Sequence, residues 1–383
     1  MNILLVSSSF YPKIDGSTRC VYDHGRKLAQ RGNAVYLVTR GVKGTPKEEM
    51  IDGIHVIRTP FRYRGGTLLN RGGLVLQQIL TVLLVARRVK ATVIHAHGYT
   101  AALSALATRY IYGTPLVITT HGTELLWPRE VWWKSPLEIK LSLIFERFVL
   151  NHCDIVVAQS PGVRDYMLRI YSARIADKIR LIPTGIDHVK FRAPVRLEPT
   201  KRIMFVGALS EVKGLTCLID AFQKVHNEVP DSSLLLVGSG PKARAYQEYA
   251  RGLELDGAVE FVGALRDDNR LIELYSGSDV VVLPSNVGGP ISVTLLEGMS
   301  MGRAVISTRV PGGIPDVLGG GSGILIDRGS VKQLEASLKR LLTDDQYLLA
   351  MKRSSRRAVE DKYTLDSMTE KLISLYKEIG ARN

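Results

Sequence analysis

Short apolar runs rich in Ile, Leu and Val alternate along the chain with longer stretches in which apolar positions recur every three or four residues. The short runs are typical of buried parallel strands, and the longer stretches are typical of amphipathic helices. Helices are expected at Thr18–Gln30 and Ala101–Ile111. In the first half we expect strands at Asn2–Ser7, Ala34–Thr39, Thr92–His95, Pro115–Thr120 and Asp154–Ala158.

The alternation stops once and then starts again. The segment Phe191–Thr200 contains Pro194, Pro199 and few apolar residues, which predicts an interdomain linker. The pattern therefore predicts an α/β protein with two Rossmann-like, doubly wound domains. Ligands bind outside the carboxyl ends of such strands, so two facing domains would enclose a cleft. The second series of strands is expected at Arg202–Val206, Ser233–Val237, Val259–Val262, Val280–Leu283, Ala304–Ser307 and Gly323–Ile326.

Length and composition agree with two soluble globular domains. A chain of 383 residues exceeds what one core usually holds, and 45% hydrophobic with 23% charged residues gives no sign of disorder. The three cysteines have no CxxC spacing, which favours a reducing, cytoplasmic setting over disulfides or a zinc knuckle. The most apolar stretch, Leu74–Ala86, is too short to cross a bilayer, which takes about 20 residues.

Charge is distributed unevenly between the two halves. Residues 1–190 carry 26 Lys and Arg against 13 Asp and Glu, whereas residues 191–383 carry 25 against 24. We find no nucleic-acid-binding motif, so an anionic membrane surface is the favoured partner of the basic half. A solvated basic surface is the alternative. The basic and aromatic segments that would lie near a membrane are Phe61-Arg62-Tyr63-Arg64, Arg87-Arg88 and the tryptophans Trp127, Trp132 and Trp133.

Loops that follow two strands of the first half are candidates for substrate binding or catalysis. Gly16 lies where a helix begins, so the free amides there can meet a phosphate. His121 follows a buried strand and can present its imidazole to a sugar hydroxyl. An ordinary helix cap at Gly16 and a turn-capping histidine are the alternatives. His95 and His97 share a face of their strand and would permit two metal ligands, but no third ligand is evident, so we expect no metal site.

The second half contains more such loops. Lys213 follows the strand-to-loop glycine Gly207 and can offset the charge of a diphosphate, unless it is an ordinary surface lysine. A glycine pair ending at Gly289 leads into a helix whose first amides, near Ile291, Ser292 and Val293, can point at phosphate. Glu297 lies among apolar neighbours in that helix. A buried carboxylate needs partners, which ribose hydroxyls or nearby backbone would supply.

Seven motifs occur in an order and spacing that resemble the retaining GT-B glycosyltransferases of glycosyltransferase family 4, and the resemblance runs nearly end to end. Each motif alone is modest, and the ordered set is specific. The motifs are Met1–Gly16, Val93-Ile94-His95-Ala96-His97, Thr120-His121-Gly122, Ile182-Pro183-Thr184-Gly185-Ile186-Asp187, Lys213-Gly214, Leu236-Val237-Gly238-Ser239-Gly240-Pro241 and Leu295-Leu296-Glu297-Gly298-Met299.

The resemblance implies transfer of a sugar from a nucleotide-diphosphate sugar, with retention of configuration and without an essential metal or other cofactor. His121 would lie by the donor sugar, Lys213 would stabilise the leaving diphosphate, and Glu297 would hold the ribose. Gly16 and Gly207 would lie by the donor. The amides from Ile291 to Val293 would cradle the diphosphate, and backbone around Gly263, Leu265 and Arg266 would recognise the base.

The resemblance also implies a division into residues 1–190 on the acceptor side, 191–365 binding the nucleotide sugar, and a helix at 366–383 that packs back on the first domain. Two positions depart from the family. Ala208 stands where the family usually has an arginine, and Gly289 stands where it has a second glutamate, for which Asn286 is a candidate substitute. Both departures concern the sugar end of the donor. Thr184 in place of the commoner asparagine is a smaller change.

The sequence therefore predicts a retaining hexosyltransferase that acts on a glycan or lipid-linked acceptor at the cytoplasmic face of a membrane. Two alternatives stay open. A nucleotide-sugar epimerase would use the same cleft without an acceptor. A glycan-assembly partner that keeps the fold but has lost the chemistry is suggested by Ala208 and Gly289.

Overall fold

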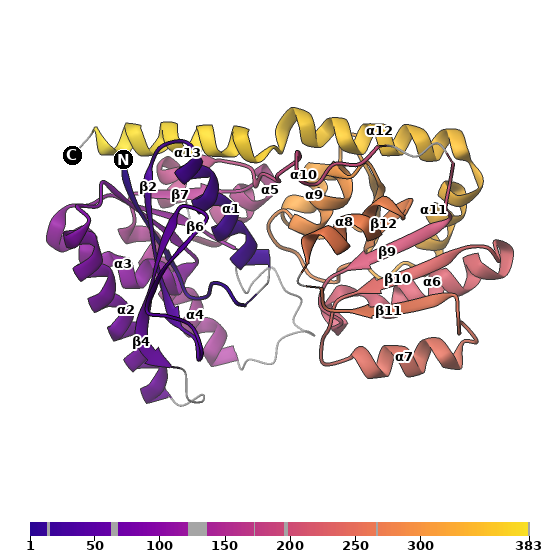
Figure 1. Ribbon diagram of the computed structural model, residues 1–383, viewed down its shortest axis with the longest axis horizontal. Coiled ribbons are helices and arrows are strands. Elements are labelled where there is room, and N and C mark those ends of the chain that lie inside the picture. The colour runs from indigo at the N-terminus through magenta and orange to yellow at the C-terminus, as the bar shows by residue number, and fades with distance from the viewer. Residues whose placement is uncertain are drawn as a thin grey trace.

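The computed structural model describes residues 1–13, 16–62, 68–121, 136–171, 173–194, 198–265 and 267–381. It contains two α/β units side by side, each built on its own sheet (Figure 1). The first sheet has the order β3-β4-β2-β1-β5-β6-β7-β8, and all its neighbours are parallel except β3 and β4. Its strands are β1 (Asn2–Ser7), β2 (Ala34–Gly41), β3 (Glu48–Ile51), β4 (Ile54–Arg62), β5 (Val93–His97), β6 (Leu116–Thr119), β7 (Ile155–Ala158) and β8 (Ile179–Leu181).

The second sheet is parallel throughout, with the order β11-β10-β9-β12-β13-β14. Chain order reverses between β9 and β12, which is the position where ligands bind in open α/β sheets. Its strands are β9 (Arg202–Val206), β10 (Ser233–Val237), β11 (Val259–Gly263), β12 (Val280–Leu283), β13 (Ala304–Thr308) and β14 (Ile324–Ile326).

Helices cover both faces of the first sheet. One face packs against α2 to α5 in a core that includes Val82, Ala105 and Leu150. The other face packs against α1 and the last helix, α13, through residues such as Val21 and Leu372. The helices of this unit are α1 (Gly16–Gln30), α2 (Leu68–Arg88), α3 (Tyr99–Tyr112), α4 (Pro136–His152), α5 (Pro161–Tyr171), α13 (Leu365–Gly380) and the 3-10 helix η3 (Ala173–Lys178).

The second unit has one core, formed between its sheet and the surrounding helices. No helix in the part of the chain that the structure describes has both the length and the hydropathy needed to cross a membrane. The helices of this unit are α6 (Leu215–Glu228), α7 (Ala243–Gly252), α8 (Asp268–Ser276), α9 (Val293–Ser300), α10 (Gly313–Leu318), α11 (Val331–Thr343), α12 (Asp345–Lys362) and the 3-10 helix η4 (Glu211–Lys213).

The predicted strands are all present, with ends that differ by at most two residues, and the prediction of two doubly wound α/β domains is confirmed. Three strands were not predicted: β3, β4 and the short edge strand β8. The pair β3–β4 is a hairpin whose turn, Asp52-Gly53, has positive φ at both residues (45° and 84°). Asp-Gly is a strong signal for such a turn, so the sequence did contain the evidence for this hairpin.

The chain passes between the two units twice, and the two passages lie side by side. The amide of Ile186 donates to the carbonyl of Tyr363, and the amide of Leu365 donates to the carbonyl of Ile186, each at 2.9 Å. A β-carbon on Gly185 would lie 2.5 Å from the carbonyl oxygen of Thr364, so the two passages touch at backbone distance. Helices α12 and α13 follow each other along one side of the molecule, and α13 ends on the first sheet, near the N-terminus (Figure 1).

Candidate active site

A cavity of about 790 Å³ lies between the two units. Its walls include Tyr11, Arg19 and His121 from the first unit and Lys213 and Glu297 from the second. Both sheets contribute loops that follow the carboxyl ends of their strands, as expected for a ligand site in this kind of fold. The cavity is therefore the place where a substrate would contact both domains.

The structure brings the predicted site residues together at this cavity, with one exception. Gly263 ends β11 with a φ of 81°, and its carbonyl accepts a hydrogen bond from the amide of Gly238 at 2.9 Å. It therefore shapes the turn behind the wall, while Leu265 lines the cavity. Arg266 lies outside the described residues. The predicted residues that line the cavity are Gly16, His121, Gly207, Lys213, Leu265, Gly289, Ile291, Ser292, Val293 and Glu297.

Loops of the second unit approach one another so closely that only glycine fits at three positions. A β-carbon on Gly238 would lie 1.9 Å from the carbonyl oxygen of Gly207. A β-carbon on Gly214 would lie 1.9 Å from the oxygen of Pro284, and one on Gly312 would lie 2.0 Å from the oxygen of Gly289. All three glycines also have positive φ. This side of the cavity is consequently built from backbone packed on backbone.

Lys213 ends η4 and projects from a loop fixed to the strand end beside it. The amide of Asn286 donates to the carbonyl of Val212 at 2.8 Å, and the Asn286 side chain donates to the carbonyl of Glu211 at 3.1 Å. Burial lowers the pKa of Lys213, because the cavity wall excludes water from its ammonium group. Asn286 braces this loop and is not among the residues that line the cavity, which disfavours it as a substitute for the missing glutamate.

The N-terminus of α9 faces the same cavity through Ser292, Val293 and Thr294. Ser292 is the N-cap residue, but its hydroxyl makes no capping hydrogen bond. The first amides of a helix need such a partner and carry a partial positive charge. They are therefore suited to an anion.

The loop before α9 leaves room for a larger side chain at Gly289. A β-carbon there would meet no atom within 4 Å, and its φ is not positive. The backbone of Gly289 is fixed, since its carbonyl accepts from the amide of Gly313 at 2.9 Å. Local packing therefore does not require glycine at this position, where the family has a glutamate.

Glu297 is 3% exposed and lies one turn further along α9. The hydroxyl of Tyr275 donates to its Oε2 at 3.0 Å, and Nε of Arg19 lies 3.7 Å from its Oε1. Burial raises the pKa of Glu297, and the charge of Arg19 opposes that shift. The carboxylate thus has partners of its own before any ribose hydroxyl is considered.

Arg19 also joins the two units, a role that sequence reasoning missed. Its two terminal nitrogens donate to the carboxylate of Asp268 at 2.8 and 2.9 Å. Lys190 donates to the same carboxylate at 2.6 Å. Together these contacts hold the pKa of Asp268 below its usual value, despite partial burial. Nothing in the local sequence marks Arg19, Tyr275 or Asp268, because their contacts depend on elements far apart in the chain.

His121 follows β6, and its Nε2 lies 3.0 Å from Nδ1 of His97. The two rings are stacked, with centroids 5.3 Å apart, and His97 is stacked on His95 at 4.6 Å. Both ring nitrogens of His95 have partners, the hydroxyls of Tyr376 and Thr119. A column of three imidazoles therefore runs from the buried sheet to the cavity wall.

Two family models match the chain, one on each unit. The model described as Glycosyltransferase Family 4 matches residues 14–190, and the one described as Glycosyl transferases group 1 matches residues 200–344. Among relatives, a glycogen synthase of Mycobacterium tuberculosis is 25% identical over 399 residues, which cover 98% of this chain and 94% of the relative.

Solved structures show the same fold. Sucrose-phosphate synthase from Thermosynechococcus elongatus superposes with a TM-score of 0.86 at 22% identity, and each chain is covered completely. HepE of Anabaena in complex with UDP-glucose superposes with a TM-score of 0.77 at 18% identity, covering 99% of this chain and 100% of HepE. From the two matched models, the paired sheets and the cavity between them, the chain belongs to glycosyltransferase family 4 and has the GT-B fold.

Proposed function

We propose that this protein transfers a hexose from a nucleotide-diphosphate sugar to a glycan or lipid-linked acceptor, with retention of anomeric configuration. One arrangement carries the proposal: Lys213, the uncapped amides of α9 and Glu297 line the same cavity. Val293 and Glu297 are four residues apart, or about 6 Å along a helix. That spacing suits a diphosphate at the start of α9 and a ribose one turn further in.

The residues suggest how the reaction would proceed. The bond between the anomeric carbon and the diphosphate oxygen breaks, and its electron pair stays on the diphosphate. Lys213 and the α9 amides stabilise that negative charge, and groups of this kind contribute about 3–4 kcal/mol each when well placed. The acceptor hydroxyl attacks from the face that the diphosphate leaves, and its proton passes to a leaving phosphate oxygen.

The nucleotide is best sought first among UDP-sugars, because the structural relative HepE is known in complex with UDP-glucose. UDP-, GDP- and ADP-glucose should be compared by thermal shift, since a bound donor stabilises the folded state by mass action. Stabilisation by one donor class, followed by anomeric analysis of the transferred sugar, would support the proposal. An inverted product would contradict retention.

The decisive variant is Lys213→Met, with Lys224→Met as its control. Lys224 is exposed and pairs with Glu335, away from the cavity. We expect Lys213→Met to reduce turnover by about two to three orders of magnitude, and Lys224→Met to leave it unchanged. No nucleotide release by the wild type with any donor and acceptor pool would instead favour the non-catalytic assembly partner suggested by Ala208 and Gly289. Conversion of donor alone to an isomeric sugar would indicate an epimerase.

A membrane surface as the place of action is supported by two exposed apolar stripes on the basic first unit. Leu76, Leu80 and Leu84 recur every four residues along α2 and are 57%, 52% and 70% exposed. Helix α4 carries a second stripe of Leu141, Ile144 and Phe148, which are 46–56% exposed. Apolar side chains next to an excess of Lys and Arg are suited to the boundary of an anionic membrane.

The membrane proposal is tested by vesicle flotation. Tyr63, Arg64 and the tryptophans expected in this surface lie outside the described residues, so the test uses α2. The wild type should float with vesicles containing anionic lipid, less so at high salt, and Leu80→Glu should weaken this binding. Tyr249→Glu, at an exposed apolar position of the second unit, is the control. Absence of binding at low salt would overturn the proposal.

A further inference from the structure

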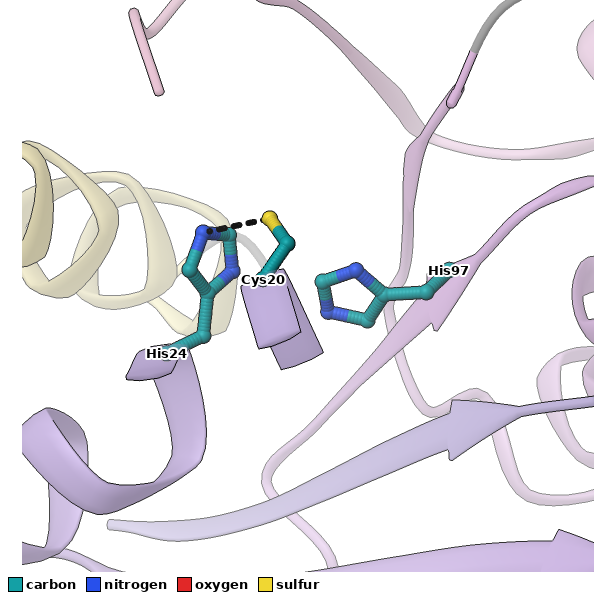
Figure 2. Close-up of side chains that lie close together, drawn as sticks. All are labelled: Cys20, His24 and His97. Atoms are coloured by element: carbon teal, nitrogen blue, oxygen red, sulfur yellow. Dashed lines mark hydrogen bonds between the residues drawn. The ribbon is translucent and has the colours of Figure 1, made fainter. Parts of the chain in front are cut away.

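Three side chains with metal-ligating atoms converge inside the first unit, beside the cavity but apart from the diphosphate site proposed above. Cys20 and His24 are four residues apart on α1, so they share one face of that helix. His97 is the last residue of β5 and points at them (Figure 2). One potential ligand atom from each side chain lies within 4.8 Å of the others. All three residues are at most 5% exposed.

Two buried nitrogens in this cluster have no hydrogen-bond partner among the described residues. They are Nδ1 of His24 and Nε2 of His97. Leaving a buried polar atom unpaired is costly, so unpaired nitrogens in a buried cluster need an explanation. The neighbouring His95 shows the contrast, because both of its nitrogens are paired.

We propose that Cys20, His24 and His97 bind one zinc-class transition-metal ion. A thiolate and two imidazoles are ligands that Zn²⁺ prefers, and three protein ligands leave a fourth position for water. Neighbouring ligands of a tetrahedral zinc ion lie about 3.5 Å apart. Sγ of Cys20 and Nε2 of His24 are already 3.3 Å apart, so a modest approach of His97 through its unpaired Nε2 completes the set. The ion would thus give Nε2 of His97 a partner, whereas Nδ1 of His24 is not a ligand in this arrangement.

Protonation is compatible with this site. Burial lowers the pKa of His24 to about 3 and that of His97 well below its usual range, so both imidazoles are neutral at pH 7. Burial raises the pKa of the Cys20 thiol to about 12. Binding therefore forms a metal–sulfur bond and releases the thiol proton to solvent, a normal feature of metal binding by cysteine.

The ion would also act on the cavity wall through one hydrogen bond. If His97 ligates through Nε2, its proton is held on Nδ1, which then donates to Nε2 of His121 at 3.0 Å. The proton of His121 is consequently placed on its own Nδ1. The metal thus makes His97 a positioning residue for His121. This consequence rests on the proposed function, whereas the metal site itself does not.

Such an ion differs from a metal bound to the donor phosphates. The family resemblance implies that no metal of that second kind is essential. It belongs to α1 and β5 of the first unit, whereas the proposed phosphate groups Lys213 and the α9 amides belong to the second. The sequence-based expectation of no metal site rested on the lack of a third ligand beside His95 and His97. The structure supplies Cys20 and His24, and the pairing of His95 excludes that residue from the set.

The site is tested with metal alone, so its failure is distinguishable from a failure of the transferase proposal. The full-length chain, stripped with a chelator, is dialysed against Zn²⁺ or Co²⁺. We expect one equivalent bound, and for Co²⁺ a thiolate-to-cobalt charge-transfer band with intense visible bands of a tetrahedral site. Cys20→Ala should remove the charge-transfer band, and His97→Gln should weaken binding at least tenfold.

Matched variants keep the test decisive. Cys217→Ala removes a thiol outside the cluster and should bind metal as the wild type does. If Cys20→Ala fails to fold by circular dichroism, Cys20→Ser, which preserves volume, replaces it. Less than about a tenth of an equivalent on the wild type would overturn the proposal, and so would a charge-transfer band that survives in the folded Cys20 variant. Histidine nitrogen shifts in NMR spectra with and without Zn²⁺ then report whether His121 changes tautomer.

Discussion

The two domains build their walls of the cavity differently, one mainly from backbone and the other mainly from side chains. On the C-terminal side, Gly214, Gly238 and Gly312 bring loop backbones into direct contact. On the N-terminal side the wall consists of side chains, notably Arg19, Cys20 and His121. Backbone contacts fix the amides that an anion needs and tolerate little change. Side-chain contacts can be exchanged singly.

The largest expected effect comes from adding one methyl group to the backbone wall. Gly214→Ala places a β-carbon 1.9 Å from the Pro284 oxygen at a φ of 68°. The strained φ and the displaced loop together should cost about 3 kcal/mol or more. Gly257→Ala is the control, because its φ is 83° but no atom lies within 4 Å of the new carbon. It should cost about 1 kcal/mol by thermal or urea unfolding, and equal losses for the two variants would contradict the backbone contact.

A smaller loss is expected on the side-chain wall from Arg19→Gln. This change leaves the buried carboxylate of Glu297 without its charge partner and should cost about 2–3 kcal/mol. The Glu297 pKa, already above its usual 4.5, should rise further. A raised carboxyl pKa means that the folded state binds more protons, so stability falls as pH rises from 4.5 through the folded-state pKa. The variant should therefore lose more stability at pH 8 than at pH 5.

The control for Arg19→Gln is Arg31→Gln. Arg31 directly follows the same helix and pairs with Asp366 and Glu370 at the exposed surface. Solvent screens exposed pairs, which contribute little to stability, so this variant should stay close to the wild type. Equal losses at Arg19 and Arg31, measured by thermal unfolding, would show that the Arg19 contacts are no more than surface pairs.

Gly289→Glu tests whether the backbone wall of the C-terminal domain accepts an added carboxylate side chain. The position has room and no positive φ, so the stability cost should stay below about 1 kcal/mol. A carboxylate restored there should increase donor affinity or turnover by up to about tenfold through a hydrogen bond to a sugar hydroxyl. Gly289→Gln, of equal length without charge, is the control. A large loss of stability would show that the position is closed.

The smallest expected effect is a gain in stability from Lys213→Met. Burial lowers the pKa of Lys213, so the folded state disfavours the ammonium form. The resulting destabilisation is present below the folded-state pKa and disappears as pH rises towards the usual 10.5. The variant should melt higher than the wild type at pH 7, with the difference narrowing at pH 10. A lower melting temperature would mean that Lys213 has a structural partner.

The residues of the backbone wall could largely be predicted from the sequence, because glycines and the start of a helix after a strand are local signals. The residues from Gly207 to Glu297 that were predicted as a site therefore do meet at one cavity, except Gly263, which shapes the turn behind its wall. The side-chain wall was less readable. Cys20 and His24 have the spacing of neighbours on a helix, but the approach of His97 depends on the pairing of β1 with β5. Arg19 meets Asp268 across 249 positions of the chain.

Helix α13 affects the order in which the two domains can fold during synthesis. Synthesis of the first sheet is complete before the second domain begins, yet one of its faces packs against Leu365, Leu372 and Tyr376 of α13. Domains made on a ribosome usually fold in the order of their synthesis. One face of the first sheet therefore keeps apolar residues exposed until α13 has been synthesised. The domain begun first is thus completed after the second one, and a chain cut short before α13 would uncover one of the two core layers of the N-terminal domain, while the layer under α2 to α5 would keep its contacts.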